Sequence, residues 1–318
     1  MGILVQKFGG TSVASVEKMK EVCNIIENYR KKGNDLVIVV SAMGRKGDPY
    51  ATDTLINLCT NVNQKPKKRE LDLIMSCGEV ISGTILSSML EGRGIPSVFL
   101  TGTQAGIITT KIYSNSKIKE INPTRIQREL DEGKVVVIAG FQGGTEDGEV
   151  TTLGRGGSDT SAVAIGKALG CETVQIYTDV DGIMTADPRI EPSAKILDYC
   201  DYEEVFQMAE KGAKVIHPRA VELAKNGDIV LEIKNTLNPS CKGTRIGLTR
   251  DAGGNYEDFQ SRFMTSVAHK DNIAQVKVKS SEALFSKILN EMEEKHINLD
   301  MINFFTEEKA FALDQNNI

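Results

Sequence analysis

The order of hydrophobic and polar positions along the first 235 residues predicts alternating strands and helices. This alternation is typical of an α/β fold with a mostly parallel sheet and helices on both faces. The run Leu36–Val40 is wholly apolar, as expected of a central strand buried on both sides. The expected strands are 3–8, 36–40, 97–100, 134–139 and 173–177. The expected helices begin at Val16 and Asp53 and cover 70–91, 158–169, 202–211 and 217–225.

The pattern stops and then restarts near the C-terminus. A stretch rich in Asp, Gly and Asn predicts a linker, and beyond it strand and helix patterns recur in the order strand, helix, strand, strand. This α+β segment ends partway through a fold. We therefore expect a large domain over 1–248, a linker over 249–261 and a small, incomplete domain over 262–318.

Composition and charge exclude several classes of protein. The 318 residues carry 38 basic and 43 acidic side chains, a net charge of −5, with 5% aromatic residues and no Trp. A general nucleic-acid binder would instead show a concentrated basic face. No apolar stretch approaches the ~20 residues of a membrane span, and no signal peptide is expected. The six cysteines include no C-x-x-C pair, so neither a zinc ribbon nor a disulfide framework is indicated, and we expect a cytoplasmic protein.

A glycine pair follows the first expected strand, in Lys7-Phe8-Gly9-Gly10. Two glycines allow backbone N–H groups to approach an anion, and the following helix N-terminus and Lys7 add positive charge. The motif is neither a P-loop nor a G-x-G-x-x-G fingerprint. Taken alone, it is more simply explained as an ordinary turn.

A second glycine loop covers residues 152–161 and also precedes a helix. A capped helix after a flexible turn explains its glycines, with Ser158 or Asp159 as the N-cap. It does not explain Arg155, whose guanidinium pairs bidentately with a carboxylate or phosphate. This loop therefore favours a binding site for a small anion.

A third motif, residues 177–189, contains three aspartates at the carboxyl end of an expected strand, where open α/β sheets bind ligands. Asp179, Asp181 and Asp187 could hold Mg²⁺. The alternative is that Asp-Gly and Asp-Pro are ordinary turn dipeptides. We expect at least one of the three to be structural.

Three further residues leave two interpretations each. Lys214 is either a second phosphate-binding cation or a solvated lysine, and alone the latter is favoured. His217, before Pro218, is expected to cap or pack at a helix start and not to act as an acid–base group. Glu79, inside an apolar helical pattern, is either a surface residue or an acceptor for an amine.

These motifs, in order across residues 1–248, resemble the aspartokinase family, whose catalytic domain has the amino-acid kinase fold. The resemblance rests on residues 7–12, 41–44, 154–160, 178–189 and 214–218. The segment from 262 resembles part of an ACT domain, a small regulatory module. The resemblance implies transfer of the ATP γ-phosphoryl group to the side-chain carboxylate of L-aspartate, giving 4-phospho-L-aspartate on the route to lysine, threonine and methionine.

The resemblance also implies roles for individual residues, with Lys7 and Asp159 as the catalytic pair and Mg²⁺ as a cofactor whose ligands stay unassigned. A carboxylate nucleophile with a pKa of about 4 is already ionised, so positioning and charge neutralisation suffice. Arg155 would bind the α-carboxylate of aspartate, and Glu79 with Asp159 the α-ammonium. The nucleotide would contact Lys7, Phe8, Gly9, Gly10, Thr178, Asp179, Met184, Arg189, Lys214 and Val215. Aspartate would contact Ser41, Thr52, Glu79, Arg155, Gly156, Gly157 and Ser158.

Several features depart from the family pattern. Met184 stands where many members carry an aromatic residue, and the loop 45–51 is longer than expected. The family usually carries two ACT modules and this sequence shows part of one, so feedback inhibition by lysine or threonine is not carried over from the family. An amino-acid effector (lysine or threonine) and a dimer or tetramer formed through this region remain expectations. The alternatives are another kinase of this fold, acting on glutamate, acetylglutamate, carbamate or UMP, and a non-catalytic amino-acid sensor.

Overall fold

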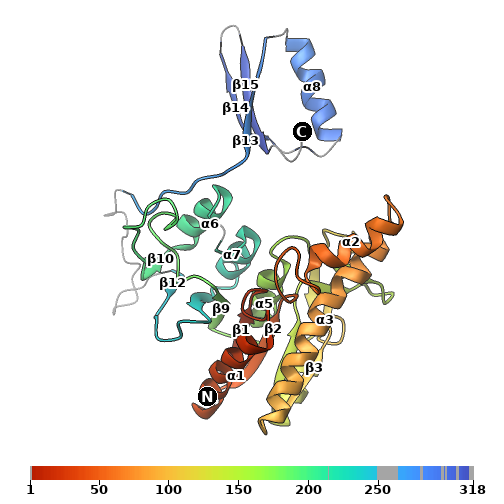
Figure 1. Cartoon of the computed structure of the whole chain (residues 1–318), viewed down its shortest axis with the longest axis vertical. Helices are drawn as coiled ribbons and strands as arrows, with labels where there is room; N and C mark the ends of the chain where they lie inside the picture. Colours follow the sequence, from red (N-terminus) through yellow and green to blue (C-terminus); the bar gives the residue numbers. More distant parts are fainter. Residues whose placement is uncertain are drawn as a thin grey trace. The chain divides into compact units, whose positions relative to one another are not determined.

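The structure is a computed structural model that describes residues 2–213, 215–248, 264–279, 282–294, 297, 299–305 and 308–314. The chain divides into two compact units, Met1–Val267 and Ala268–Ile318 (Figure 1). The linker expected over 249–261 lies outside the described residues, as does Lys214.

An eight-stranded sheet forms the centre of the first unit, with the order β10-β12-β11-β9-β1-β2-β6-β3. All its strand pairs are parallel except β11 with β12, which confirms the expected α/β class. The strands are β1 (Ile3–Phe8), β2 (Asp35–Val40), β3 (Ser97–Leu100), β6 (Val135–Ala139), β9 (Thr173–Thr178), β10 (Tyr199–Cys200), β11 (Val230–Asn235) and β12 (Thr244–Ile246).

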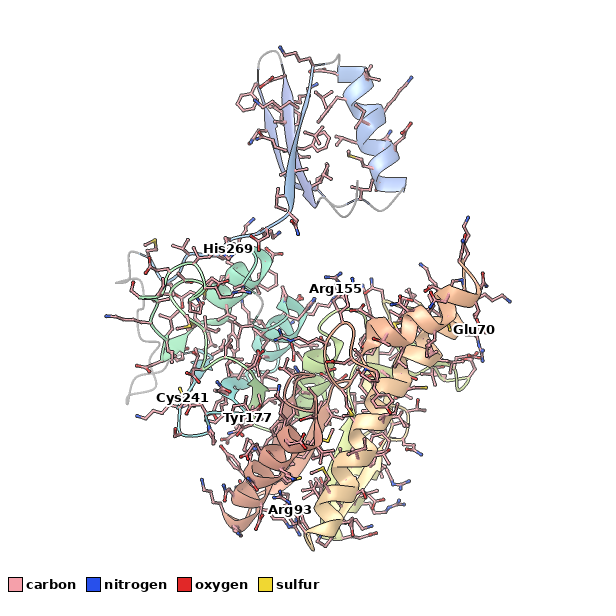
Figure 2. The ribbon with its side chains drawn as sticks, in the orientation of Figure 1. Glu70, Arg93, Arg155, Tyr177, Cys241 and His269 are labelled. Carbon is pink, nitrogen blue, oxygen red and sulfur yellow. The ribbon has the colours of Figure 1, made fainter. Side chains whose placement is uncertain are left out.

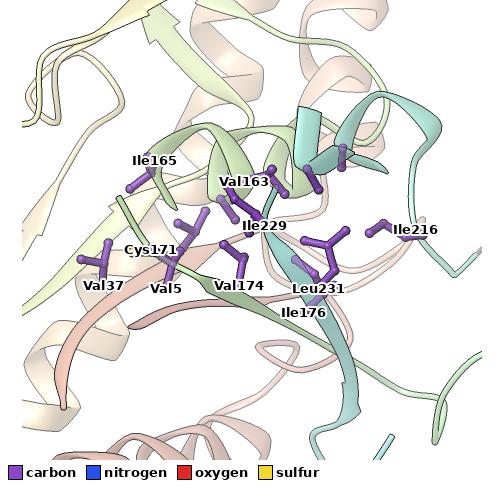
Figure 3. Close-up of a cluster of buried hydrophobic side chains, with 14 of the residues drawn as sticks. Val5, Val37, Val163, Ile165, Cys171, Val174, Ile176, Ile216, Ile229 and Leu231 are labelled. Atoms are coloured by element: carbon purple, nitrogen blue, oxygen red, sulfur yellow. The ribbon is translucent and has the colours of Figure 1, made fainter. Parts of the chain in front are cut away.

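Helices cover both faces of this sheet. Strand β2 shows why, because Leu36, Ile38 and Val40 pack in one hydrophobic cluster and Val37 and Val39 in the other. The first cluster includes side chains of α1 and α3, and the second, partly drawn in Figure 3, includes side chains of α4, α5, α6 and α7. The helices are α1 (Val16–Lys31), α2 (Thr52–Val62), α3 (Lys68–Gly92), α4 (Thr124–Asp131), α5 (Gly157–Ala168), α6 (Tyr202–Glu210) and α7 (Pro218–Lys225).

A second, smaller sheet of the first unit was not predicted. Its order is β5-β4-β7-β8, and each strand has only three or four residues. The pairing of β4 with β5 also shifts register between Ile108 and Thr109, which removes the regular alternation that sequence reading detects. The strands are β4 (Ile107–Thr109), β5 (Ile118–Ile121), β7 (Gln142–Gly144) and β8 (Val150–Thr152).

Helix α3 corrects the expectation that no segment is long and apolar enough to span a bilayer. Within the described residues it alone meets that criterion by length and composition, and half of its most apolar window is buried in the protein. Its Leu86 and Leu90 belong to the core beneath the central sheet. A core helix passes the same test, so this single match is weak evidence for a membrane span.

The second unit contains β13 (Ile273–Val278), α8 (Glu282–Glu294), β14 (Leu299–Phe304) and β15 (Lys309–Asp314). Its antiparallel sheet has the order β13-β15-β14. Phe285 of α8 packs with Phe311 and Leu313 of β15 to form a small core. This is the α+β part expected after the first domain.

Candidate active site

The loops after β2, β1 and β9 meet at one edge of the central sheet, because these three neighbouring strands are parallel. The Gly9 N–H donates to the Tyr177 carbonyl at 3.1 Å, and the Ser41 N–H donates to the Phe8 carbonyl at 3.1 Å. The Gly44 N–H donates to the Gly10 carbonyl, also at 3.1 Å. Segments 7–12, 41–44 and 177–179 therefore form one continuous surface.

Gly9 and Gly10, which we call the glycine turn, leave no room for a larger residue at the second position. A Cβ atom on Gly10 would lie 2.8 Å from the carbonyl oxygens of both Ala42 and Gly44. Phe8, by contrast, is buried and stacks on Tyr177 with ring centroids 4.7 Å apart. Any contact between Phe8 and a nucleotide would thus involve its backbone and not its ring.

Lys7 and Asp159 connect the first two glycine motifs. The Lys7 Nζ lies 2.6 Å from the Asp159 Oδ1, and each side chain is only 11% exposed. Lys7 belongs to β1 and Asp159 to the first turn of α5, so residues far apart in sequence form one charged pair. The two residues predicted to be catalytic are in contact.

The beginning of α5 differs from the prediction. Its N-cap is Gly156, in the left-handed region at φ 68°, and not Ser158 or Asp159, which lie inside the helix. A Cβ atom on Gly156 would lie 2.1 Å from the His217 Cγ, so this position requires glycine for space as well as conformation. The predicted N-cap was wrong because a left-handed glycine starts the helix without a side-chain cap.

Arg155 projects from the loop between β8 and α5 and is exposed (Figure 2). The neighbouring His217 is the N-cap of α7, and its Nδ1 accepts from the Arg219 N–H at 3.3 Å, which confirms the expected capping role. Burial, with a smaller contribution from Arg219, lowers the pKa of His217. A neutral imidazole in this position is suited to its structural role.

Glu79 is buried in helix α3, with 3% of its surface exposed, so the surface interpretation is wrong. Its Oε1 accepts from the Ala42 N–H at 2.9 Å, while its Oε2 is buried without a hydrogen-bond partner. Burial raises the pKa of Glu79 to about 8. A buried acceptor without a donor is costly unless a ligand supplies one. Ser41, next to Ala42, lies beside it and accepts through its carbonyl from Ser82 Oγ at 2.6 Å.

The three aspartates of residues 177–189 bind three different partners. Asp179 pairs with Arg45, and Asp181 accepts from the side-chain amides of Asn235 and Asn238 at 2.7 and 3.1 Å. Asp187 pairs with Arg189 at 2.6 Å. Within the described ranges no three His, Cys, Asp or Glu side chains gather in a metal-binding group. Among the described residues the three aspartates are thus not gathered in one group, and Asp181 is held by two asparagine side chains.

The remaining residues predicted to bind nucleotide or aspartate have their own separate contacts. Thr178 Oγ1 donates to Asp179 Oδ1 at 3.3 Å, and Thr52 is the first residue of α2 and half-buried. Met184 pairs with Ile196 in an isolated bridge, and its carbonyl accepts from Ser266 Oγ at 3.0 Å. Val215 packs against the core, while Lys214 lies outside the described residues.

The sequence analysis did not single out two residues near the site, Arg45 and Asp72. Arg45 was considered only as part of a long loop, although a basic residue just after a strand end was a usable signal. Asp72 precedes Glu79 by seven residues, which places both carboxylates on one face of α3. It is fully buried and accepts from Thr152, the first residue of the second glycine loop.

Comparison with known proteins gives consistent matches. Residues 2–235 match the family described as "Amino acid kinase family". The chain is 43% identical over 305 residues to an aspartokinase of Geobacillus stearothermophilus, covering 95% of this chain and 72% of that protein. It is 41% identical over 319 residues to aspartokinase 1 of Bacillus subtilis, covering 99% and 78%.

Solved structures show the same fold. Aspartokinase III of E. coli, in complex with aspartate and ADP, has a TM-score of 0.79 at 23% identity, covering 99% of this chain and 79% of that one. A UMP kinase of Bacillus anthracis has a TM-score of 0.57 at 19% identity, covering 77% and 95%. At these identities the likeness concerns the fold alone.

Proposed function

We propose that this chain, which belongs to the amino acid kinase family and within it to the aspartokinases, is an aspartate kinase. The proposed reaction transfers the γ-phosphoryl group of ATP to the side-chain carboxylate of L-aspartate, giving ADP and 4-phospho-L-aspartate. The observation that carries the proposal is the Lys7–Asp159 contact at 2.6 Å, because it unites the glycine turn and the second glycine loop in one site.

On the nucleotide side, the chain supplies amides and one nearly buried ammonium group. The N–H groups of Gly9, Ser12 and Val13 are already bonded to backbone carbonyls, so those of Gly10 and Thr11 are the ones proposed to bind phosphate. Lys7 lies beside them, since its Nζ is 3.5 Å from the position a Cβ on Gly9 would take. We further propose that Thr178, Asp179, Met184, Arg189, Lys214 and Val215 line the nucleotide site.

On the acceptor side, Glu79 and Arg155 each bind one α-group of aspartate, the ammonium or the carboxylate. The buried Oε2 of Glu79 would accept a hydrogen bond from the α-ammonium, with Asp159 nearby, and Arg155 would bind the α-carboxylate. Because the reacting carboxylate is already ionised at neutral pH, no general base is required. The proposed aspartate site is completed by Ser41, Thr52, Gly156, Gly157 and Ser158.

Mg²⁺ is proposed as the metal that accompanies the nucleotide. The described residues contain no ready-made cage for a metal, which fits an ion that usually keeps several waters and binds mainly through substrate phosphates. When bound, it would neutralise the negative charge of the phosphate groups. The chain's own residues position the two substrates around it.

For residues 262–318, which include the second unit, we propose a partial ACT-like regulatory domain, after a catalytic domain over 1–248 and a linker over 249–261. A solved E. coli aspartokinase III carries lysine as well as aspartate. We propose lysine or threonine as a possible effector here, a homo-oligomer formed through this region, and a cytoplasmic location.

The experiment that tests the proposed function measures ADP release from Mg-ATP with aspartate, glutamate or UMP as acceptor. Hydroxylamine is included to trap an acyl phosphate as a hydroxamate. Hydroxamate formed from aspartate alone would support the proposal. Turnover with UMP or glutamate alone would replace it with another kinase of this fold, and no turnover with any acceptor would favour a non-catalytic sensor.

A further inference from the structure

An ion pair joins the segments that follow β2 and β9, on either side of strand β1 and its glycine turn. Arg45 follows β2 and Asp179 follows β9, and β1 lies between these two strands in the sheet. The Arg45 guanidinium nevertheless contacts the Asp179 carboxylate. To make this contact, the arginine side chain must extend past the end of β1, where Gly9 and Gly10 lie.

Two backbone hydrogen bonds confirm this path. Gly44, the residue before Arg45, donates to the Gly10 carbonyl at 3.1 Å, and Gly9 donates to the Tyr177 carbonyl at 3.1 Å, two residues before Asp179. The ion pair closes a ring of contacts that runs through all three strand-end segments. The guanidinium is therefore held next to the surface proposed to receive phosphate.

Arg45 differs from Lys7 in how firmly its partner holds it. Lys7 and Asp159 are each 11% exposed, whereas Arg45 is 71% and Asp179 41% exposed. Exposed ion pairs contribute little to stability, so this pair can separate at small cost. A guanidinium carries five N–H donors in a fork that matches phosphate, and Asp179 accepts from one of them.

The geometry points to Arg45 as a phosphate-binding residue that exchanges Asp179 for the polyphosphate of the bound nucleotide. In the nucleotide-free protein Asp179 holds the guanidinium beside the glycine turn. When a nucleoside triphosphate binds, the arginine transfers its hydrogen bonds to phosphate oxygens, and no covalent bond changes. This inference rests on the proposed nucleotide site, and it does not depend on which acceptor is phosphorylated.

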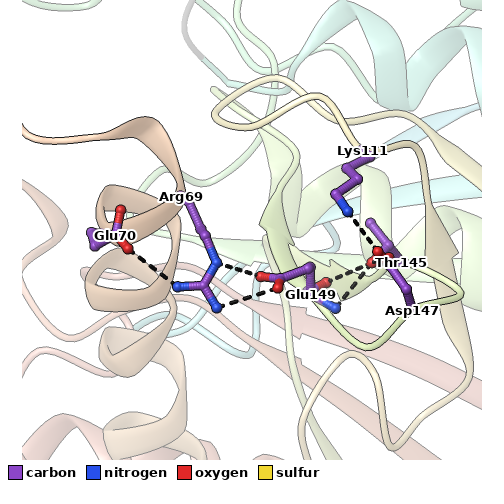
Figure 4. Close-up of polar contacts among 6 residues, drawn as sticks. All are labelled: Arg69, Glu70, Lys111, Thr145, Asp147 and Glu149. Atoms are coloured by element: carbon purple, nitrogen blue, oxygen red, sulfur yellow. Dashed lines mark hydrogen bonds and ion pairs between the residues drawn. The ribbon is translucent and has the colours of Figure 1, made fainter.

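The test is direct binding of a non-hydrolysable ATP analogue, measured by calorimetry with the full chain. The variants are Arg45→Ala, Arg45→Lys and the double variant Arg45→Ala with Asp179→Asn. Arg69→Ala is the matched control, because Arg69 is also exposed and pairs with a carboxylate, Glu149 at 2.6 Å, in a cluster outside the site (Figure 4). Thermal unfolding of each variant checks that it remains folded.

We expect Arg45→Ala to weaken binding of the analogue at least tenfold and Arg45→Lys to weaken it less. Adenosine, which lacks phosphate, should bind equally to the wild type, Arg45→Ala and Arg45→Lys, and Arg69→Ala should match the wild type. The double variant should remain as weak as Arg45→Ala, since its defect is a missing phosphate contact.

Three results would overturn the inference. The first is wild-type affinity in Arg45→Ala. The second is recovery in the double variant, because Arg45 would then only mask the charge of Asp179. The third is an equal loss for adenosine. If the analogue binds in an Arg45-dependent way but aspartate is never phosphorylated, the proposed function fails and this inference stands.

Discussion

Two buried carboxylates on helix α3 differ in how completely the protein satisfies them. Asp72 is fully buried, and it accepts from Ser114 and Thr152 through the backbone N–H and the side-chain hydroxyl of each, at 2.8–3.1 Å. Glu79, two turns later on the same face, accepts from Ala42 N–H alone and keeps Oε2 without a partner. One helix therefore carries a carboxylate whose hydrogen bonds the protein completes (the completed site, Asp72) and a carboxylate with one oxygen left without a donor (the unfinished site, Glu79).

The difference separates a structural role from a binding role. A buried charge is tolerated when donors surround it, so Asp72 needs nothing further and joins α3 to the end of β8. Glu79 lacks a donor, and the missing one matches an ammonium group. Burial by itself does not identify a functional carboxylate, whereas an unused acceptor does.

The largest effect is expected at the completed site. Asp72→Ala would leave several buried N–H and hydroxyl groups of Ser114 and Thr152 without an acceptor, lowering the free energy of unfolding by about 3–5 kcal/mol. Denaturant unfolding measures this loss. Wild-type stability in Asp72→Ala would show that the comparison between the two carboxylates is mistaken.

The next effect concerns catalysis. Lys7→Ala removes the ammonium beside the glycine turn, so turnover should fall about 10²–10³-fold while the KM for aspartate changes little. Steady-state kinetics at saturating ATP measures both. Lys134→Ala, which breaks an ion pair with Glu129 at 2.7 Å on α4, is the control. Equal turnover of wild type and Lys7→Ala would remove Lys7 from the chemistry.

The burial of Glu79 predicts that the stability of the protein depends on pH. Burial raises the pKa of folded Glu79 to about 8, whereas the unfolded chain has the ordinary value of 4.5, so folding favours the protonated form. The ligand-free protein should therefore lose a few kcal/mol of stability as pH rises between these values. Glu79→Gln stays neutral and should lack this loss.

The measurement compares unfolding of wild type and Glu79→Gln between pH 5 and 8.5 without aspartate. The two curves should nearly coincide at the acidic end, and the variant should be the more stable protein at the basic end. Parallel curves throughout would mean that Glu79 is solvated and that its second oxygen is not an unused acceptor.

The smallest effect is expected at the exposed Arg155. Arg155→Ala should raise the KM for aspartate about tenfold with turnover near the wild-type value, because a substrate contact is lost equally in ground and transition states. Arg155→Lys should recover part of the loss, since it keeps the charge without the fork. An unchanged aspartate KM would leave Glu79 as the acceptor-side contact on which the proposal depends.

The sequence predicts five strands of the central sheet, misses its strands β10, β11 and β12, and predicts none of the small sheet. Strands such as Leu36–Val40 are buried on both faces, so every position requires an apolar side chain and the sequence shows an uninterrupted apolar run. Strands β4, β5, β7 and β8 are too short for a pattern, and their order depends on long-range pairing. Local periodicity carries no information about such contacts.

The same division applies to the site. The glycines at positions 10 and 156 are necessary because a Cβ atom would clash at both positions. Their presence in the sequence therefore indicated the two glycine motifs that form the site. The burial of Glu79, the separate partners of the three aspartates and the Arg45–Asp179 pair depend on packing between distant segments. Residue types suggest a chemistry, and only the fold decides which of them meet.

The central position of β1 has a consequence for biosynthesis. Strand β1 is synthesised long before its neighbour β9, which ends only at Thr178, so one edge of β1 stays unpaired for much of the translation of this region. An unpaired apolar edge invites association with other chains. Fragments ending before Thr178 should therefore aggregate and need chaperones, whereas chains that extend past β9 can close the sheet and complete the Lys7–Asp159 pair together.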